Sequence, residues 1–535
     1  MKLNILLRNF LIFTLFLLMI NLNSCKTSHD IPKEYTNYIF KNQSDNKSYF
    51  IKLDSIDGAY AKGRMYLIYN DLTMRPETFI LNLNKNKCIV KCSNSNVYTL
   101  KLSKKNNERY EGYMSSNIFS GKRYFLLEPY VTADNQLFNL NRYKEELFDV
   151  ERISNIKYAK VKGFWSSIPD DTIDVVNVVK TGFLSTLKRT DLDLDMDIYI
   201  PKNDTLSKRP LLMLIHGGAF FIGDKATVPY QKWCTHFASL GYICVSINYR
   251  MGFRINSKAI ERTAYQETQD AHAAMRYLVS KQDIYRIDTD NLFVGGASAG
   301  SITAMNLAFM RNKDRPESSY SSLFMEDLGD LETSGNKIIN DFKIKAVANM
   351  WGTIYDLNIL KNSNASIISF HGDEDVILPY GFGYPFRAIG EFQKVLFDKM
   401  YGSSYIKEKA LDLGIRSELH TFKGQGHALH LDENRNLNQN FYKIQDEITD
   451  FFYDELITYP VDIVQDENDL QIFTIDTADV LKSDWSIVGG IIIEESKRKV
   501  RALWFDDDTK QELRVSGYYR NGAGFEDVLK INYTK

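Results

Sequence analysis

The chain has 535 residues, a formal net charge of −2 and 44% hydrophobic residues. These values predict a packed globular protein with about two to four domains of about 100–200 residues each. The charge argues against nucleic acid as the main partner, because that binding requires clustered cations. Five cysteines in this length do not make a disulfide framework. Cys234 and Cys244 are interpreted as buried thiols, with a bond between them left open.

Residues 1–24 are predicted to be a targeting segment. Lys2 and Arg8 supply positive charge, and residues 10–20 form an apolar run. The run is shorter than the ~20 residues that cross a bilayer and suits a signal-peptide core. The following Leu22-Asn23-Ser24-Cys25 resembles a bacterial lipobox, which implies a lipid on Cys25 and a place in the cell envelope. Cleavage by the ordinary secretory peptidase, which would give a secreted protein, and an uncleaved anchor both stay open.

Residues 25–165 are expected to form an all-β domain. Short apolar or alternating runs are separated by polar turns, a pattern typical of a sandwich or a small barrel. No catalytic constellation occurs among them, so a structural or binding module is predicted. The expected strands are 49–51, 64–69, 78–83, 97–102 and 123–127.

Residues 172–457 alternate between buried strands and helices. Continuous apolar strands of this kind indicate a mostly parallel sheet with helices on both faces, whose active site lies beyond the C-terminal ends of the strands. The helix predicted over 264–281 is expected to turn its Gln, Glu and Asp side chains outward. The other expected helices are 232–240, 387–400 and 438–456, and the strands are 192–200, 211–215, 242–248, 292–294, 344–349, 367–370 and 418–422.

Residues 458–535 return to a β pattern. Three stretches, 485–490, 501–504 and 519–522, are similar to PKD-type immunoglobulin-like modules, which implies a β-sandwich domain. The expected strands are 461–464, 471–475, 491–493, 500–504 and 512–515.

The stretch Gly296-Ala297-Ser298-Ala299-Gly300 carries the strongest local signal. It has the spacing G-x-S-x-G and joins a buried strand to the start of a helix. A serine at such a corner occupies strained backbone, so its neighbours two positions away must be small. The corner exposes the hydroxyl, and the helix start leaves unpaired N–H groups beside it.

Three further motifs also follow directly after predicted strands. Because parallel strands end at one edge of a sheet, all four are expected to lie close together. The three are His216-Gly217-Gly218-Ala219-Phe220, His371-Gly372-Asp373-Glu374-Asp375 and Gly424-Gln425-Gly426-His427.

Together, the four motifs resemble the α/β-hydrolase fold over residues 172–456. Within that fold they resemble the hormone-sensitive-lipase-like carboxylesterases and the related feruloyl and acetyl xylan esterases. The order of nucleophile, acid and histidine is the order of that fold. The resemblance implies that Ser298 is the nucleophile, His427 the general base, and Asp375 the carboxylate that orients it.

The resemblance also implies an oxyanion hole formed by the backbone N–H groups of Gly217, Gly218 and Ala299. This mechanism requires neither a cofactor nor a metal. Asp373 and, after it, Glu374 are the other candidates for the acid, although the family spacing selects Asp375.

Other histidines are weighed against His427. His420 is placed on the preceding strand and His430 on the following helix turn. His216 and His371 are interpreted as side chains that fix loops.

Phe220, Tyr249, Trp351 and Tyr380 follow strand ends and are expected either to line the substrate pocket or to pack beneath the loops. The leading hypothesis is a lipid-anchored serine hydrolase that cleaves carboxylic esters through an acyl-enzyme. Its substrates would include acetyl or feruloyl esters on polysaccharide, and its other partner is the membrane. The alternatives are a serine peptidase of the same fold and a non-catalytic envelope binding protein.

Overall fold

The computed structural model describes most of the chain, in two compact units. The first unit comprises Met1–Phe138, Val461–Tyr518 and Phe525–Lys535, and the second comprises Asn139–Pro460 and Tyr519–Gly524. Residues 1–24 and Cys25 lie outside the described residues. The described residues are 37–42, 48–57, 60–68, 74–82, 87–91, 97–106, 109–115, 123–129, 141–168, 189–253, 258–322, 325–456, 461–477, 480–505 and 510–531.

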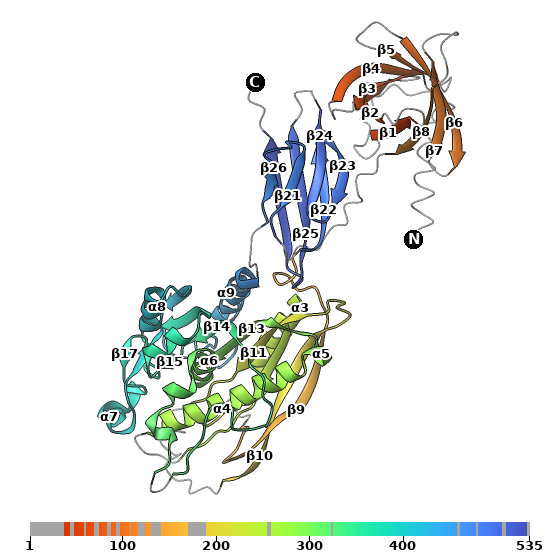
Figure 1. The fold of residues 1–535 in the computed structure, drawn as a ribbon. Coiled ribbons are helices and arrows are strands. Elements are labelled where there is room, and N and C mark those ends of the chain that lie inside the picture. Colours follow the sequence, from red (N-terminus) through yellow and green to blue (C-terminus); the bar gives the residue numbers. More distant parts are fainter. Residues whose placement is uncertain are drawn as a thin grey trace. The chain divides into compact units, whose positions relative to one another are not determined.

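In the first unit, eight consecutive strands close into a barrel, one of the two forms expected from the sequence (Figure 1). Each strand pairs antiparallel with the next, and β1 pairs with β8, so no edge strand remains. Three of the strands, β1, β5 and β7, were not predicted. The strands are β1 (Asn37–Asn42), β2 (Ser48–Asp57), β3 (Tyr60–Ile68), β4 (Met74–Asn82), β5 (Lys87–Lys91), β6 (Val97–Asn106), β7 (Arg109–Ser115) and β8 (Arg123–Pro129).

The C-terminal strands of the first unit form two sheets, in the orders β20-β21-β24-β23 and β22-β25-β26. The sequence predicted five of these strands and missed β22 and β26, in which charged and polar residues interrupt the apolar pattern. The strands are β20 (Ile463–Gln465), β21 (Ile472–Ile475), β22 (Val480–Val488), β23 (Gly490–Ser496), β24 (Lys499–Trp504), β25 (Gln511–Tyr519) and β26 (Gly524–Ile531).

The second unit is built on an eight-stranded sheet in the order β19-β16-β14-β13-β11-β12-β10-β9. The six strands from β19 to β12 run parallel, and β10 and β9 are antiparallel at one edge. This confirms the predicted α/β class with a mostly parallel sheet. The strands are β9 (Val150–Gly163), β10 (Thr190–Pro201), β11 (Arg209–Ile215), β12 (Ile243–Ile247), β13 (Ile287–Ala297), β14 (Ile344–Met350), β16 (Ser366–Gly372) and β19 (Ser417–Phe422).

The predicted boundary between the N-terminal β domain and the hydrolase region is wrong. Strand β9 falls within 25–165, yet it pairs with β10 along its whole length. Arg152 donates to the buried carboxylate of Asp197 at 2.5 and 3.1 Å, and Asn155 N donates to it at 2.9 Å. An edge strand exposed on one face has the alternating pattern of any β domain, so the sequence alone did not separate it.

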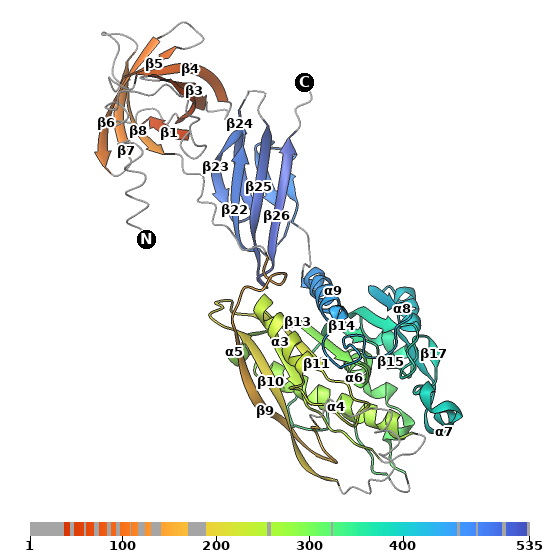
Figure 2. The same ribbon diagram turned by 180° about the vertical axis from the view of Figure 1, so that it is seen from behind.

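Helices cover both faces of the sheet (Figures 1 and 2). On one face, α4 (Ala259–Ser280), α6 (Ala299–Phe309) and α8 (Ser403–Asp412) contribute to the main core with the strands. On the other, α3 (Val228–Leu240) and α9 (Gln439–Leu456) meet through a ring stack of Trp233 on Phe441. Phe293 of β13 stacks on Phe452 of this second layer, whereas its neighbours Leu292 and Val294 join the main core.

The polar residues of α4 do not face outward as predicted. Asp270 is fully buried and accepts a hydrogen bond from Arg250 Nη2 at 2.6 Å. Gln269 is also buried, and its Nε2 donates to the carbonyl oxygens of residues 328–330 at 2.8–3.2 Å. Burial also raises the pKa of Glu267 well above its usual value. The loop that follows α6 covers this face of α4, a tertiary contact that helical periodicity cannot reveal.

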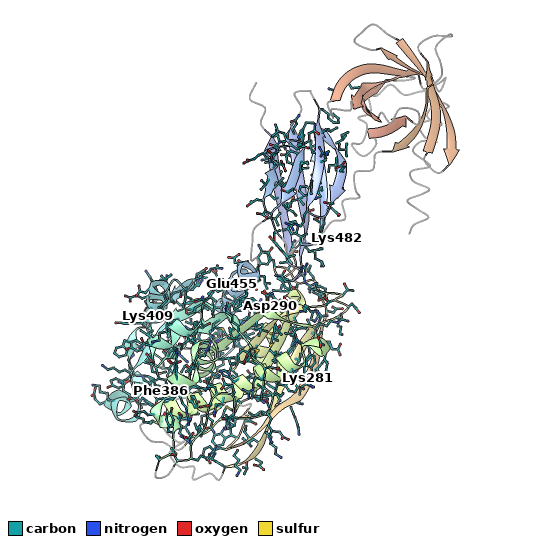
Figure 3. All side chains as sticks on the ribbon, viewed as in Figure 1. Lys281, Asp290, Phe386, Lys409, Glu455 and Lys482 are labelled. Carbon is teal, nitrogen blue, oxygen red and sulfur yellow. The ribbon has the colours of Figure 1, made fainter. Side chains whose placement is uncertain are left out.

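Residues 387–400 do not form the single helix expected. The chain makes a 3-10 helix (Arg387–Phe392), the short α7 (Gln393–Leu396) and then β18 (Met400–Gly402). Gly390 breaks the first helix with φ 65° and ψ −150°, a conformation that favours glycine. Phe386, labelled in Figure 3, precedes these elements and is buried. Strand β18 joins β15 (Thr353–Ile354) and β17 (Phe382–Gly383) in a small sheet.

Two further features of the described residues lie outside the site. Cys234 and Cys244 are free and buried, which confirms the interpretation as buried thiols. In the described part of the chain, no helix combines the length and the hydropathy that a membrane span needs.

We predict that His272 makes the protein less stable in acid. Its ring is buried against Phe342, and neither ring nitrogen has a hydrogen-bond partner among the described residues. Burial, and then the nearby Arg276 and Arg311, lower its pKa to about 3. The unfolded state therefore binds an extra proton below about pH 6.5, so stability is present above that pH and falls as the pH decreases.

Between pH 6.5 and pH 5 the wild type should lose about 2 kcal/mol more unfolding free energy than the H272F variant. The reason is that one extra proton bound by the unfolded state costs about 1.4 kcal/mol per pH unit. Urea denaturation of both proteins at the two pH values measures the difference. Equal losses in the two proteins would show that His272 does not cause the acid sensitivity.

Candidate active site

Ser298 lies at the corner between β13 and α6, as the sequence predicts. Its φ of 56° and ψ of −120° are strained for a residue with a side chain. A Cβ on Gly296 would lie 2.2 Å from the carbonyl oxygen of Gly300, and one on Gly300 would lie 2.1 Å from that of Ile215. Both glycines are therefore required for the corner to close against β11. Ser298 N donates to Met350 O at 2.9 Å and joins the corner to β14.

The three side chains expected to form a triad do meet. His427 Nε2 lies 2.9 Å from Ser298 Oγ, although the two residues are 129 positions apart. His427 Nδ1 lies 2.6 Å from Asp375 Oδ2. A carboxylate on Nδ1 fixes the proton there, which leaves Nε2 able to accept the proton of the serine hydroxyl. The arrangement can activate Ser298 as a nucleophile.

Asp375 is fully buried and receives hydrogen bonds at both oxygens. Oδ1 accepts from the N–H groups of Ile377 and Leu378 at 2.7 and 3.0 Å. Oδ2 lies 2.6 Å from His427 Nδ1 and 3.3 Å from His371 Nε2. Burial alone would raise the pKa of Asp375, but the charges and hydrogen bonds of the two histidines hold it well below its usual range. The carboxylate is therefore ionised at neutral pH.

Asp373, the alternative acid, does not contact His427. Its carboxylate accepts a hydrogen bond from Gly424 N at 2.6 Å, and the neighbouring Glu374 N donates to Gln425 O at 3.1 Å. These contacts hold the loop that carries His427. In the ranges that the structure describes, no group of three or more His, Cys, Asp or Glu side chains is arranged to hold a metal ion.

Gly217 does not serve as the oxyanion donor predicted for it. Its N–H donates to the hydroxyl of Tyr230 at 3.1 Å and is already engaged. A Cβ at this position would lie 2.7 Å from Ala297 O and 3.2 Å from the Cβ of Ser298. Glycine is needed here because the loop packs tightly against the nucleophile corner. The motif shows that the backbone comes close to the serine, but not which N–H remains free.

The N–H groups of Gly218 and Ala299 remain candidates for the oxyanion hole. Within the described residues neither donates to another protein atom, and the same holds for Ala219 N. Gly218 has φ +118°, and a Cβ there would lie 1.9 Å from Ile222 O. The Gly218 carbonyl accepts from the N–H groups of Phe221 and Ile222 at 3.0 Å each, which fixes the turn. Ala299 is the first residue of α6, where N–H groups have no partner within the helix.

His216 fixes the loop after β11, as interpreted from the sequence. It is buried, and Tyr249 OH donates to its backbone oxygen at 2.6 Å while the two rings stack with centroids 4.3 Å apart. Burial lowers the pKa of His216 to about 4, so the ring is neutral at neutral pH. Tyr249 is completely buried under the loop. Of the two alternatives expected for this ring, its burial favours packing beneath the loop.

Two of the other three pocket candidates are also almost completely buried. Phe220 and Trp351 expose 2% and 1% of their surface. Trp351 lies edge-on to the ring of His427 and stacks on His430 at 4.9 Å. Only Tyr380 is partly exposed, and its hydroxyl is hydrogen-bonded to Thr421 Oγ1 at 2.7 Å. The buried rings therefore pack beneath the loops.

Sequence reasoning missed the role of Tyr230. It lies on α3, outside every recognised motif, and a tyrosine in a helix carries no signal for a contact with a distant loop. His430 lies on a turn between β19 and α9 and not on the helix turn expected, and its ring is buried between Trp351 and Trp233. His420 lies on β19 and stacks on Phe370.

Residues 196–375 match the family model BD-FAE. Tuliposide B-converting enzyme 1, amyloplastic, of Tulipa gesneriana is 32% identical over 130 residues, which are 22% of this chain and 28% of that protein. Gut esterase 1 of Caenorhabditis briggsae is 28% identical over 117 residues, or 21% of this chain and 20% of that protein. The chain thus spans roughly a quarter of the length of these two relatives.

Two longer similarities cover about half of the chain. Probable carboxylesterase 3 of Arabidopsis thaliana is 23% identical over 283 residues, 49% of this chain and 84% of that protein. The solved structure of Thermogutta terrifontis esterase 2 phosphorylated by paraoxon has a TM-score of 0.36 and 19% identity, and covers 49% of this chain and 89% of that chain. By its sheet order, its serine corner and its sequence matches, the second unit is an α/β-hydrolase. Its sequence is similar to carboxylesterases of that fold.

We predict that D375N and D373N have very different effects. An amide at 375 can donate to His427 Nδ1 and stabilise the wrong tautomer, so kcat for a 4-nitrophenyl ester should fall by about 10⁴-fold. An amide oxygen at 373 can still accept from Gly424 N, so D373N should retain most of its kcat. Steady-state kinetics of the two variants decide between the acids, and a larger loss in D373N would contradict the assignment.

Proposed function

We propose that this protein is a serine carboxylic-ester hydrolase that acts through an acyl-enzyme intermediate. The observation that carries the proposal is the continuous contact from Ser298 Oγ to His427 Nε2 at 2.9 Å and from His427 Nδ1 to Asp375 Oδ2 at 2.6 Å. The carboxylesterase and esterase relatives support the reaction class.

In the proposed first step, Ser298 Oγ attacks the ester carbonyl while His427 Nε2 takes the hydroxyl proton. The C–O bond of the leaving alcohol then breaks, and His427 returns the proton to the alcohol. In the second step His427 removes a proton from water, whose oxygen attacks the acyl carbonyl. The bond from the acyl carbon to Ser298 Oγ then breaks, His427 returns the proton to Oγ, and the acid leaves. Asp375 stays ionised and stabilises the imidazolium formed in each step.

The negative oxygen of each tetrahedral intermediate requires hydrogen-bond donors. Because Gly217 N–H is engaged by Tyr230, we assign this role to Gly218 and Ala299, with Ala219 N–H also available beside them. One such donor typically contributes about 2.7–4 kcal/mol to transition-state stabilisation.

We further propose that the substrates include acetyl or feruloyl esters carried by polysaccharide. The support is the resemblance of the four motifs to those of feruloyl and acetyl xylan esterases, together with the match to BD-FAE. Two β-rich regions precede and follow the hydrolase unit in the sequence. They are the part of residues 25–165 that comes before β9, and residues 458–535, and we propose that they are separate domains. A role in holding such a polymer would suit them.

We predict that S298A abolishes both turnover and covalent labelling. The wild type should react with a fluorophosphonate probe and hydrolyse 4-nitrophenyl acetate, whereas S298A should lose the label and as much as ~10⁶-fold in kcat. A panel of acetylated and feruloylated xylan beside short nitrophenyl esters then identifies the acyl group.

The controls separate the alternatives. Hydrolysis of an aminoacyl anilide without hydrolysis of the nitrophenyl ester would favour a peptidase. A wild type that resists the probe and hydrolyses neither substrate would favour a binding protein and contradict the proposal.

We also propose that the protein is anchored in the cell envelope by a lipid on Cys25. The support is the sequence alone, namely the apolar run of residues 10–20 and the lipobox-like Leu22-Asn23-Ser24-Cys25. We predict that C25S moves the protein from the membrane fraction to the soluble fraction, or leaves it with its uncleaved leader, and prevents labelling by a clickable fatty acid. Labelling that persists in C25S would contradict the anchor.

A further inference from the structure

The acid of the triad has a second histidine partner. His371 lies at the end of β16, four residues before Asp375, and is completely buried. Its Nε2 lies 3.3 Å from Asp375 Oδ2, the same oxygen that contacts His427 Nδ1 at 2.6 Å, and 3.4 Å from the carbonyl oxygen of Leu378. One carboxylate oxygen therefore lies between two imidazole rings, and the catalytic steps above use only one of them.

Behind His371 a series of buried polar side chains reaches the helix that begins after the nucleophile. His371 Nδ1 lies 2.8 Å from Ser403 Oγ, at the start of α8. Ser403 Oγ lies 3.1 Å from Asn349 Nδ2 of β14, and Asn349 Oδ1 lies 2.5 Å from Ser301 Oγ of α6. Asn349 Nδ2 also donates to Ser369 Oγ at 3.0 Å. These side chains are completely inaccessible to solvent.

The donor and acceptor roles along this series follow from the requirement that each polar atom has a hydrogen-bond partner. Asn349 Nδ2 can only donate, so Ser403 Oγ accepts from it and has its own proton to donate to His371 Nδ1. An accepting Nδ1 places the ring proton on Nε2, which faces the carboxylate of Asp375 and the carbonyl oxygen of Leu378. At the other end, Asn349 Oδ1 can only accept, so Ser301 donates to it. Every polar atom in the series then has a partner, as buried polar groups require.

Tight packing keeps the series in register. A Cβ on Gly352 would lie 2.4 Å from Ser301 Oγ and 2.5 Å from Asn349 Oδ1, so only glycine fits beside this hydrogen bond. A Cβ on Gly402 would lie 1.9 Å from Pro379 O, and Ser404 Oγ donates to Tyr380 O at 3.0 Å. The start of α8 is thus fixed against the loop that carries Asp375.

We propose that His371 is a positioning residue for the hydrolytic reaction, an inference that rests on the proposed function. By donating from Nε2 to Asp375 Oδ2, it holds the carboxylate in the orientation that His427 needs. Through Ser403, Asn349 and Ser301, it links the acid loop to α6, the helix that begins directly after the nucleophile. His371 does not contact the substrate and acts through Asp375.

Two substitutions at this position separate the two ring nitrogens. An asparagine nitrogen or oxygen reaches about as far as Nδ1, so H371N keeps a partner for Ser403 and loses the donor to Asp375. A glutamine amide reaches about as far as Nε2, so H371Q keeps a donor to Asp375. We expect H371N to lower kcat for 4-nitrophenyl acetate by about 10- to 100-fold with little change in KM, and H371Q to restore most of it.

Ser403 tests the link to the rest of the series. S403A should lower kcat by about three- to tenfold, because His371 then loses the partner that sets its tautomer. The S403A/H371N double variant should be no slower than H371N, because both changes act through the same contact with Asp375. A matched control is H420N, which replaces a histidine on the neighbouring β19 that stacks on Phe370 and has no part in the proposed site. It should keep the wild-type kcat.

The measurements are kcat, KM, the rate of fluorophosphonate labelling and the thermal melting temperature of each variant. A wild-type kcat in H371N, equal losses in H371N and H371Q, or a loss confined to KM would overturn the inference while the proposed function stands. If a variant has a lowered melting temperature, its kcat is compared with that of H371Q at a temperature at which both proteins are folded. Equal kcat values at that temperature would also overturn the inference. A wild type that neither labels nor hydrolyses the ester overturns the proposed function and this inference together.

Discussion

The site depends on Asp375 keeping its negative charge while it is completely buried. An isolated buried carboxylate costs several kcal/mol, so it requires hydrogen-bond donors from the protein. Two come from the backbone of Ile377 and Leu378, and the other two from His427 and His371. Since the backbone donors follow the acid directly, the loop itself binds the carboxylate. The histidines then connect that loop to the nucleophile and to the interior of the sheet.

The second constraint is the close approach of the chain around Ser298. Gly217, Gly296 and Gly300 each lie where a Cβ would be within 2.7 Å of a backbone atom. Their shared role is therefore steric, since they let the loop after β11 and the start of α6 converge on the serine. This also explains why the G-x-S-x-G and His-Gly-Gly motifs can be recognised in a sequence. A requirement for the absence of a side chain leaves a local signature, whatever the surrounding structure.

The parts of the molecule that were predictable from sequence are those with such local signatures. The parallel strands, the nucleophile corner and the convergence of Ser298, Asp375 and His427 follow from apolar runs that end in motifs. The engagement of Gly217 N–H by Tyr230, in contrast, depends on a helix that follows the motif. The burial of the polar face of α4 and the membership of β9 in the hydrolase sheet likewise depend on which segments cover which face. No pattern within a single segment contains that information.

The second unit is discontinuous along the chain, because it includes the turn Tyr519–Gly524 between β25 and β26. Asn521 Nδ2 donates to the carbonyl of Leu456, at the end of α9, across 65 positions at 2.8 Å, and Tyr143 OH donates to Asn521 O at 2.6 Å. When α9 has left the ribosome, Asn521 has not yet been translated, so these hydrogen bonds cannot form. During synthesis, the end of the hydrolase unit at α9 therefore stays incomplete until the turn Tyr519–Gly524 has been translated.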